Sequence, residues 1–197
     1  MANNNAQIDL FETPVMEKPV TYEYEVFLSI TKNIEEDAVM LKGKTEVIVG
    51  PDRQKYFRPH ISFLSFKQKA GKDLVMSALQ NALLNFGPVD VEINGFEIFN
   101  KGPRGQAIIL SVVESEALKN LYALIQSTFR SGKMKGLHLT IIRTVYLFDQ
   151  EAVQAQLNAL NYYGTFQCTQ LTLLRRPKDS KEKYEEVGVL NLGSETE

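Results

Sequence analysis

Apolar and polar residues alternate along several segments of the chain, and this period of two predicts β-strands with one buried face. The alternation is clear at residues 22–30, which read YEYEVFLSI, and at residues 58–66, which read RPHISFLSF. Strands are expected at residues 22–30, 58–66, 89–99, 106–113, 136–144, 165–174 and 184–192.

A helical period occurs in three other segments. Over residues 72–86 the apolar side chains fall on one stripe of a helix, which ends at the Gly-Pro pair that follows. Two more helices are expected at residues 115–129 and 149–160. Residues 31–58 have a mixed pattern, in which a short apolar run, TEVIVG, precedes a second Gly-Pro turn, and no helix is assigned there.

The order of these elements suggests a duplication. Each half of the chain has a strand with a histidine, then a helix, a long strand and a final strand. This order favours antiparallel pairing over a doubly wound parallel sheet. The two histidines are 78 residues apart, which is too far for a solenoid repeat. The expected fold is therefore α+β, a duplicated bilobal unit with two antiparallel sheets flanked by helices around a central cleft.

The domain boundaries follow from the same pattern. Residues 1–19 are polar and are expected to form a flexible N-terminal arm. Residues 20–197 are expected to form one bilobal domain, with halves at about 20–113 and 114–197.

Composition excludes several classes of protein. A net charge of −2 over 197 residues argues against a generally basic nucleic-acid coat protein, although a local basic cleft is compatible with it. A single cysteine, Cys168, cannot form an internal disulfide, which favours a reducing compartment. No window reaches the roughly 20 apolar residues of a membrane span, and the N-terminus lacks the layout of a secretory signal. A cytoplasmic protein without membrane contacts is expected.

The candidate chemistry lies in the two histidine strands. His60 is followed two residues later by Ser62, and His138 is followed by Thr140 in the same way. Side chains two apart in a strand share a face, so each imidazole has a hydroxyl beside it. Serine and threonine make up about one residue in nine, so both histidines would show this spacing by chance roughly once in eighty cases.

Two imidazoles and two hydroxyls meeting across a cleft suit attack on a phosphodiester. One histidine takes a proton from water or a ribose hydroxyl while the other protonates the departing oxygen. Ser62 and Thr140 would bind the non-bridging oxygens as their charge develops. This scheme needs neither a metal nor a cofactor.

Other sites are less well supported by the sequence. Two histidines and one distant cysteine are too few ligands for a usual zinc site. The fragment GKT at 43–45 resembles the end of a phosphate-binding loop, but Ala38 stands where the first glycine should be. No G-x-S-x-G motif is present, and Cys168 is expected to be a small core residue.

At these motifs the sequence resembles the two-histidine phosphoesterase superfamily, and within it the 2′-5′ RNA ligase family. The motifs stand here as HISFL at 60–64 and HLTII at 138–142. The second family motif often ends in an arginine, and Arg143 occupies that place. At an odd offset from His138, Arg143 reaches the cleft only if the strand bulges or ends first.

The resemblance implies a bilobal fold and metal-independent chemistry on 2′,3′-cyclic phosphates or 2′-5′ links in RNA or nucleotides. It implies that His60 and His138 are acid and base, with phosphate bound by Ser62, Thr140 and Arg143. The expected partners are RNA ends or cyclic and 2′-5′-linked nucleotides, bound by a monomer. Basic residues that could attract them occur at 101–104, 133–135 and 175–178, and aromatic residues that could stack a base include Tyr22, Tyr24, Phe57 and Tyr184.

Two further activities stay open on the sequence. The same pocket in a non-catalytic module would bind a nucleotide or RNA without turning it over. The reverse reaction, joining RNA ends through a 2′-5′ bond, is also possible, and hydrolysis is the easier direction in water.

Overall fold

Strands and helices alternate along the chain largely as the periodicity predicts, with one helix more than expected. The computed structural model describes residues 20–52, 58–69, 71–130, 132–147 and 149–193, so the expected arm at 1–19 lies outside the described residues. The elements in chain order are β1 (Tyr22–Leu28), α1 (Lys32–Val49), β2 (Ile61–Gln68), α2 (Lys72–Leu83), β3 (Val89–Asn100), a 3-10 turn (Gly102–Arg104), β4 (Gln106–Val112), α3 (Glu116–Phe129), β5 (Lys133–Met134), β6 (His138–Val145), α4 (Gln150–Ala159), β7 (Tyr163–Cys168), β8 (Gln170–Pro177) and β9 (Glu185–Asn191).

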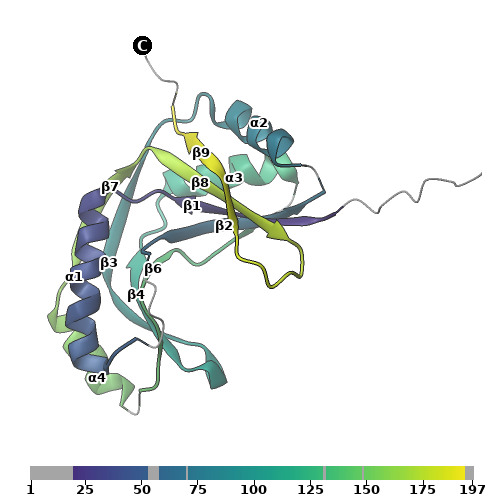
Figure 1. Cartoon of the computed structure of the whole chain (residues 1–197). Helices are drawn as coiled ribbons and strands as arrows, with labels where there is room; N and C mark the ends of the chain where they lie inside the picture. The colour runs from purple at the N-terminus through teal and green to yellow at the C-terminus, as the bar shows by residue number, and fades with distance from the viewer. Residues whose placement is uncertain (1–19, 53–57, 70, 131, 148, 194–197) are drawn as a thin grey trace, which may run out of the picture.

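The strands form one curled antiparallel sheet (Figure 1). Its order is β7-β3-β4-β6-β2-β1-β8-β9, with β5 paired to β2. Two separate sheets were expected from the sequence, but the strands form a single continuous sheet. The central strands β2 and β6 are paired through Ile61 and Leu139, which joins the two halves of the sheet into one.

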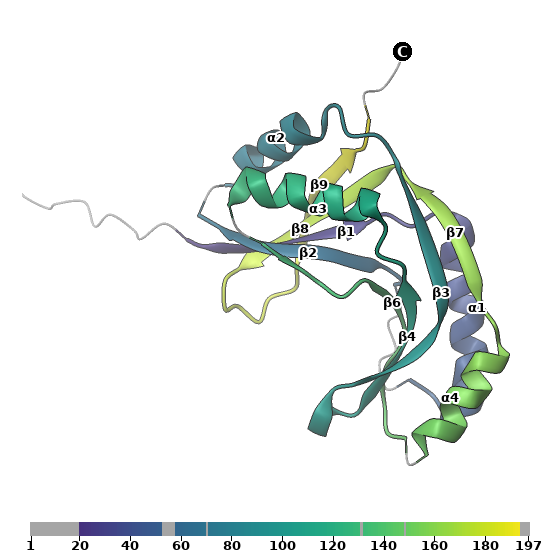
Figure 2. The ribbon, with the colours of Figure 1, turned by 180° about the vertical axis from the view of Figure 1, so that it is seen from behind.

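The helices cover the outer side of this curl in two pairs. Helices α1 and α4 pack together against the β6 and β3 end, and α2 and α3 pack together over the β2 and β9 end (Figures 1 and 2). Helix α1 comes from the first half of the sequence, yet it packs on strands of the second, and α3 does the reverse. Each end of the sheet, together with its helices, therefore contains segments from both halves of the chain. The two ends do not coincide with the halves expected at about 20–113 and 114–197.

Helix α1 was missed because its buried stripe is narrow and weakly apolar. Its buried residues are Ile34, Ala38, Leu41 and Thr45, which have helical spacing but include a small and a polar side chain. The β-branched run at its end resembles a strand in isolation, since such residues favour strands. The helix ends at Gly50, whose φ of 86° is unfavourable for other residues.

The strand expected at 165–174 is two strands. Strand β7 pairs with β3, whereas β8 pairs with β1 at the other end of the sheet. Only Thr169 separates them in sequence. Because both strands alternate in the same way, the apolar pattern does not reveal the change of partner.

The core lies between the sheet and the helices, which leaves the concave side of the sheet uncovered by any of the four described helices (Figure 2). On β1, Tyr24, Val26 and Leu28 are at most 1% exposed, while the residues between them are partly exposed. No helix in the described part of the chain combines the length and apolar character of a membrane span.

Candidate active site

The two histidine motifs lie side by side at the centre of the sheet. His60 immediately precedes β2, and His138 is the first residue of β6. Ile61 is paired with Leu139, and both are fully buried against the core. Because neighbours in a strand point to opposite faces, the residues on either side of this pair project from the concave side.

Four of the predicted residues are thereby brought together. About the Ile61–Leu139 pair, the antiparallel register sets His60 opposite Thr140 and Ser62 opposite His138. All four are partly exposed. The two histidines are diagonal neighbours in this register, and in a regular antiparallel pair such positions are about 7–8 Å apart. The charge of His138 acts on His60, as expected for neighbouring rings.

Both imidazoles are oriented in the same way. The Nδ1 atom of His60 is 2.9 Å from the carbonyl oxygen of Arg58, and Nδ1 of His138 is 2.7 Å from that of Gly136. A carbonyl oxygen only accepts hydrogen bonds, so each Nδ1 carries the proton and donates it. The remaining nitrogen, Nε2, is then an acceptor in the neutral ring and a donor in the charged ring. Both rings are thus prepared for proton transfer through Nε2.

A phenylalanine stacks on each histidine. The ring of Phe27 lies 4.4 Å from that of His60, and the ring of Phe99 lies 6.3 Å from that of His138, with interplanar angles of 15° in both cases. These contacts restrict ring rotation, since the imidazole is held by a hydrogen bond at its edge and by an aromatic face. The sequence gives no signal for either contact, because Phe27 and Phe99 belong to strands that precede the histidine strands.

Burial lowers the pKa of His60 below its ordinary value of 6.5, and the nearby positive charge of Arg143 and the His138 ring lower it further. The hydrogen bond to Arg58 and the carboxylate of Glu25 oppose this shift without reversing it. His60 is therefore mainly neutral at neutral pH, which is the form that accepts a proton.

A β-bulge decides the position of Arg143. In the pairing of β4 with β6, Ile109 is opposite Thr140 and the next residue back, Ile108, is opposite Ile142. Ile141 is the extra residue of this bulge, and it shifts the alternation by one. Ile141 and Ile142 are both fully buried, and Arg143 returns to the side of His138. The strand therefore bulges before Arg143, as the sequence required for Arg143 to lie on the same side as His138.

The first motif carries the same irregularity. Between β1 and β2, Val26 is opposite Leu64 and Phe27 is opposite Ser62, so Phe63 is the extra residue. Ser65 consequently occupies in the first motif the place that Arg143 occupies in the second. Sequence reasoning missed Ser65, although the paired apolar residues FL and II, three and four positions after each histidine, are the available signal.

Arg143 is held by its backbone from two sides. Its N–H donates to Oδ2 of Asp52 at 3.2 Å, and its carbonyl oxygen accepts from Nζ of Lys101 at 2.7 Å. The side chain of Asp52 is 2% exposed and forms an ion pair with Lys42 at 3.0 Å. These contacts tie the bulged strand to helix α1 and to the segment that follows it. The sequence gives no indication of them, since Asp52 and Arg143 are 91 residues apart.

A pocket of about 190 Å³ adjoins His60 and is lined on its other sides by Phe27, Ser29, Arg58 and Thr172. No group of three or more His, Cys, Asp or Glu side chains placed to hold a metal occurs among the described residues. Cys168 is fully buried, and burial raises the pKa of its thiol to about 11, which fits its expected place in the core.

Comparison with known proteins places this arrangement in a family. The model of the 2′-5′ RNA ligase superfamily matches residues 49–180, more than half of the chain and including both histidine motifs. This chain belongs to the 2′-5′ RNA ligase superfamily. No curated protein sequence matches the chain significantly.

Solved structures agree with this superfamily fold. TT0787 of Thermus thermophilus aligns with a TM-score of 0.58 at 13% identity, over 88% of this chain and 99% of that one. E. coli LigT complexed with 3′-AMP aligns with a TM-score of 0.57 at 11% identity, over 90% and 100%. The LigT complex with NADP+ aligns with a TM-score of 0.55 at 14% identity, over 87% and 98%. At these identities the likeness establishes the curled fold and its four helices.

Proposed function

We propose that the protein is a phosphodiesterase that hydrolyses 2′,3′-cyclic phosphate or 2′-5′ phosphodiester bonds in RNA or nucleotides. One observation carries the proposal. Two imidazoles on paired strands project from the same face, and both are held through Nδ1 with Nε2 left for proton transfer. Binding alone would not require both rings to be prepared in this way.

We assign the role of general base to His60. Its lowered pKa keeps Nε2 unprotonated near neutral pH, so it accepts a proton from the attacking water. The water oxygen forms a bond to phosphorus as this proton leaves. His138, in its charged form, donates its Nε2 proton to the ribose oxygen as the bond from that oxygen to phosphorus breaks. A cyclic phosphate then yields a phosphate monoester and one free ribose hydroxyl.

The neighbouring groups stabilise the charge that develops. Ser62 and Thr140 donate their hydroxyl protons to the non-bridging oxygens, and Arg143 adds a positive charge on the same face. None of these steps uses a metal ion. In the reverse direction the same two proton transfers would join an RNA end through a 2′-5′ bond, as a secondary activity.

The comparisons support a nucleotide as the ligand. E. coli LigT has been solved in complex with 3′-AMP, NADP+ and ATP. A nucleoside 3′-phosphate such as 3′-AMP is one of the two products expected from opening a 2′,3′-cyclic phosphate.

The test is a substrate screen on the wild type and the double variant His60→Ala/His138→Ala. Nucleoside 2′,3′-cyclic phosphates and 2′-5′-linked dinucleotides are incubated with and without a metal chelator, and products are separated by chromatography. We expect turnover by the wild type that persists in chelator and is absent in the double variant. Tight nucleotide binding by calorimetry without any product would contradict the proposal and favour the non-catalytic binding module.

A further inference from the structure

A larger pocket, of about 500 Å³, opens farther along the first motif strand. Its floor includes Ser65 and Lys67 of β2 and Glu25 of β1. Because Phe63 is the extra residue of the bulge, Ser62 and Ser65 lie opposite residues only two apart on β1, so they are about 7 Å apart along the sheet. The pocket therefore continues the concave face beyond the candidate phosphate site. The proposed reaction does not use this larger pocket.

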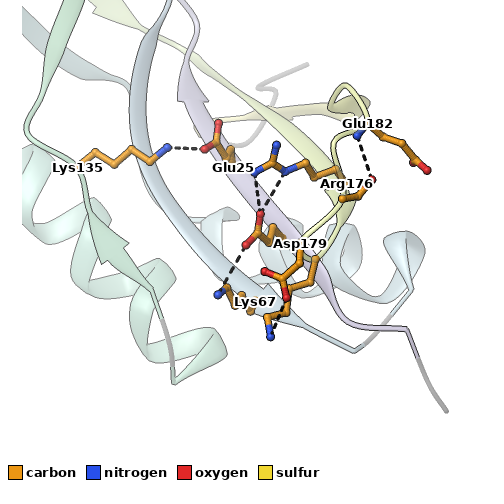
Figure 3. Close-up of polar contacts among 9 residues, drawn as sticks. Glu25, Lys67, Lys135, Arg176, Asp179 and Glu182 are labelled. Atoms are coloured by element: carbon orange, nitrogen blue, oxygen red, sulfur yellow. Dashed lines mark hydrogen bonds and ion pairs between the residues drawn. The ribbon is translucent and has the colours of Figure 1, made fainter. Parts of the chain in front are cut away.

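Ion pairs hold the acidic side chains of this floor. Glu23 Oε2 accepts from both Nε and Nη2 of Arg176, at 3.2 and 3.0 Å, and Lys67 lies 3.6 Å from Glu23 Oε1. Lys135 donates to Glu25 from the opposite side (Figure 3). Their carboxylate oxygens are thus engaged by cations, so they offer few free acceptors for reading the edge of a base.

An aromatic ring and a guanidinium form one wall. The guanidinium carbon of Arg176 lies 4.5 Å from the centre of the Tyr184 ring, and both residues line the pocket. Nε and Nη2 of Arg176 both donate to one oxygen of Glu23, and these two contacts restrain rotation of the guanidinium plane. Bases of single-stranded RNA stack on such tyrosine rings and guanidinium planes.

Positive charge dominates the polar residues around the pocket. Lys67, Lys133 and Arg176 line it together with Glu23 and Glu25, and Lys135 adds a fourth cation to the two carboxylates. Lys133 is exposed and has no ion pair among the described residues. An excess of lysine and arginine around a stacking surface is suited to the phosphate backbone of a nucleic-acid strand.

We propose that this pocket is a second subsite, which binds the nucleotide on the 5′ side of the reacting one. Its base stacks on the Tyr184–Arg176 wall, and Lys133 contacts its backbone phosphate. The inference rests on the proposed function and narrows it: the substrate is an oligonucleotide end, with little preference for the base at the second position.

The test compares substrate lengths. The kcat/KM of adenosine 2′,3′-cyclic phosphate is measured beside that of a dinucleotide ending in the same group, with each of the four bases at the added position. We expect the wild type to favour the dinucleotides about tenfold, from one stacked base, with at most a few-fold spread among the bases. In Tyr184→Ala the preference should fall to about twofold or less. Arg176→Lys, which keeps the charge but removes the plane, should lie between.

The matched control is Tyr163→Ala, which removes a tyrosine that is 60% exposed on β7, outside the pocket. It should retain the wild-type ratio. Lys133→Ala should reduce the slope of log kcat/KM against log salt for the dinucleotide by about 0.7. Equal kcat/KM for both lengths in the wild type, or equal losses for both in Tyr184→Ala, would overturn the subsite.

The two proposals fail in different ways. If the wild type turns over neither length, its proposed activity on 2′,3′-cyclic phosphates is wrong. The subsite is then tested by calorimetry, using adenosine 3′-phosphate and a dinucleotide 3′-phosphate with the wild type and Tyr184→Ala. Binding of the dinucleotide about tenfold more tightly, lost in the variant, would still support it, and equal binding would not.

Discussion

The two histidine motifs are alike in backbone and in ring orientation. Each histidine donates Nδ1–H to the carbonyl two residues before it, each stacks on a phenylalanine, and each strand bulges after its hydroxyl residue. The duplication expected from the sequence is thus repeated in the local geometry of the site.

The motifs differ in the residue that the bulge turns back to the concave side. In the first motif it is Ser65, which opens into the larger pocket, and in the second it is Arg143, whose backbone is held by Asp52 and Lys101. The difference is a full positive charge, and it contributes to the lowered pKa of His60. Two rings with the same geometry can therefore have different roles because one neighbour differs in charge.

Removal of either ring should have the largest effect. We expect His60→Ala and His138→Ala each to lower kcat by about 10²- to 10⁴-fold, since each removes one proton transfer. The double variant should be little slower than the slower single variant, because the rings act as a unit. Single-turnover rates on a cyclic phosphate measure this. Losses that multiply in the double variant would mean that the two motifs work independently.

Substitution of Arg143 should break the asymmetry between the motifs. Arg143→Gln is expected to lower kcat/KM by about 10- to 10²-fold through loss of a charged contact to the phosphate. The equivalent change in the first motif, Ser65→Ala, should cost less than about threefold. Steady-state kinetics on one mononucleotide substrate compare the two. Equal effects would show that the position after the bulge matters and its charge does not.

Asp52 should stabilise the protein through the bulge of the second motif. Asp52→Ala leaves the N–H of Arg143 and the ammonium of Lys42 without this buried partner, and should lower the free energy of unfolding by about 1–3 kcal/mol. Asp52→Asn, which keeps an acceptor oxygen, should lose less. Urea denaturation measures both. A smaller loss for Asp52→Ala than for Asp52→Asn would argue against this role.

The smallest expected effect is on pH dependence. Because Arg143 disfavours the charged form of His60, its removal in Arg143→Gln should raise the pKa of His60 toward 6.5. With His60 as base, activity falls as pH drops through that pKa, so the acidic limb of the kcat/KM profile should move to higher pH. Titration of the ring by NMR gives the pKa directly. A shift to lower pH would exclude His60 as the base.

The sequence predicted seven strand segments and three of the four described helices, but it joined β7 and β8 into one strand and missed the short strand β5. It also predicted that a hydroxyl residue shares a strand face with each histidine, as the register of β2 and β6 has it. It did not predict helix α1, whose buried stripe includes Ala38 and Thr45, or the change of partner at Thr169. It made the position of Arg143 depend on a bulge. The signal for Ser65, the apolar pair FL, was overlooked, and the sequence carries no sign of the contacts of Phe27, Phe99 or Asp52.

The features that could be predicted without coordinates are local: a histidine and a hydroxyl two residues apart in a strand share a face, whatever the strand's partner. The pairing of the two motifs through Ile61 and Leu139 became evident only in the folded chain, as did the bulges that return Ser65 and Arg143 to the concave side. The position of a bulge and the register of a strand pair are determined by the hydrogen bonds between the two strands. Residues far apart in the chain form those bonds. The adjacent apolar residues FL and II mark where the alternation breaks, but only the folded chain shows which strand is paired there.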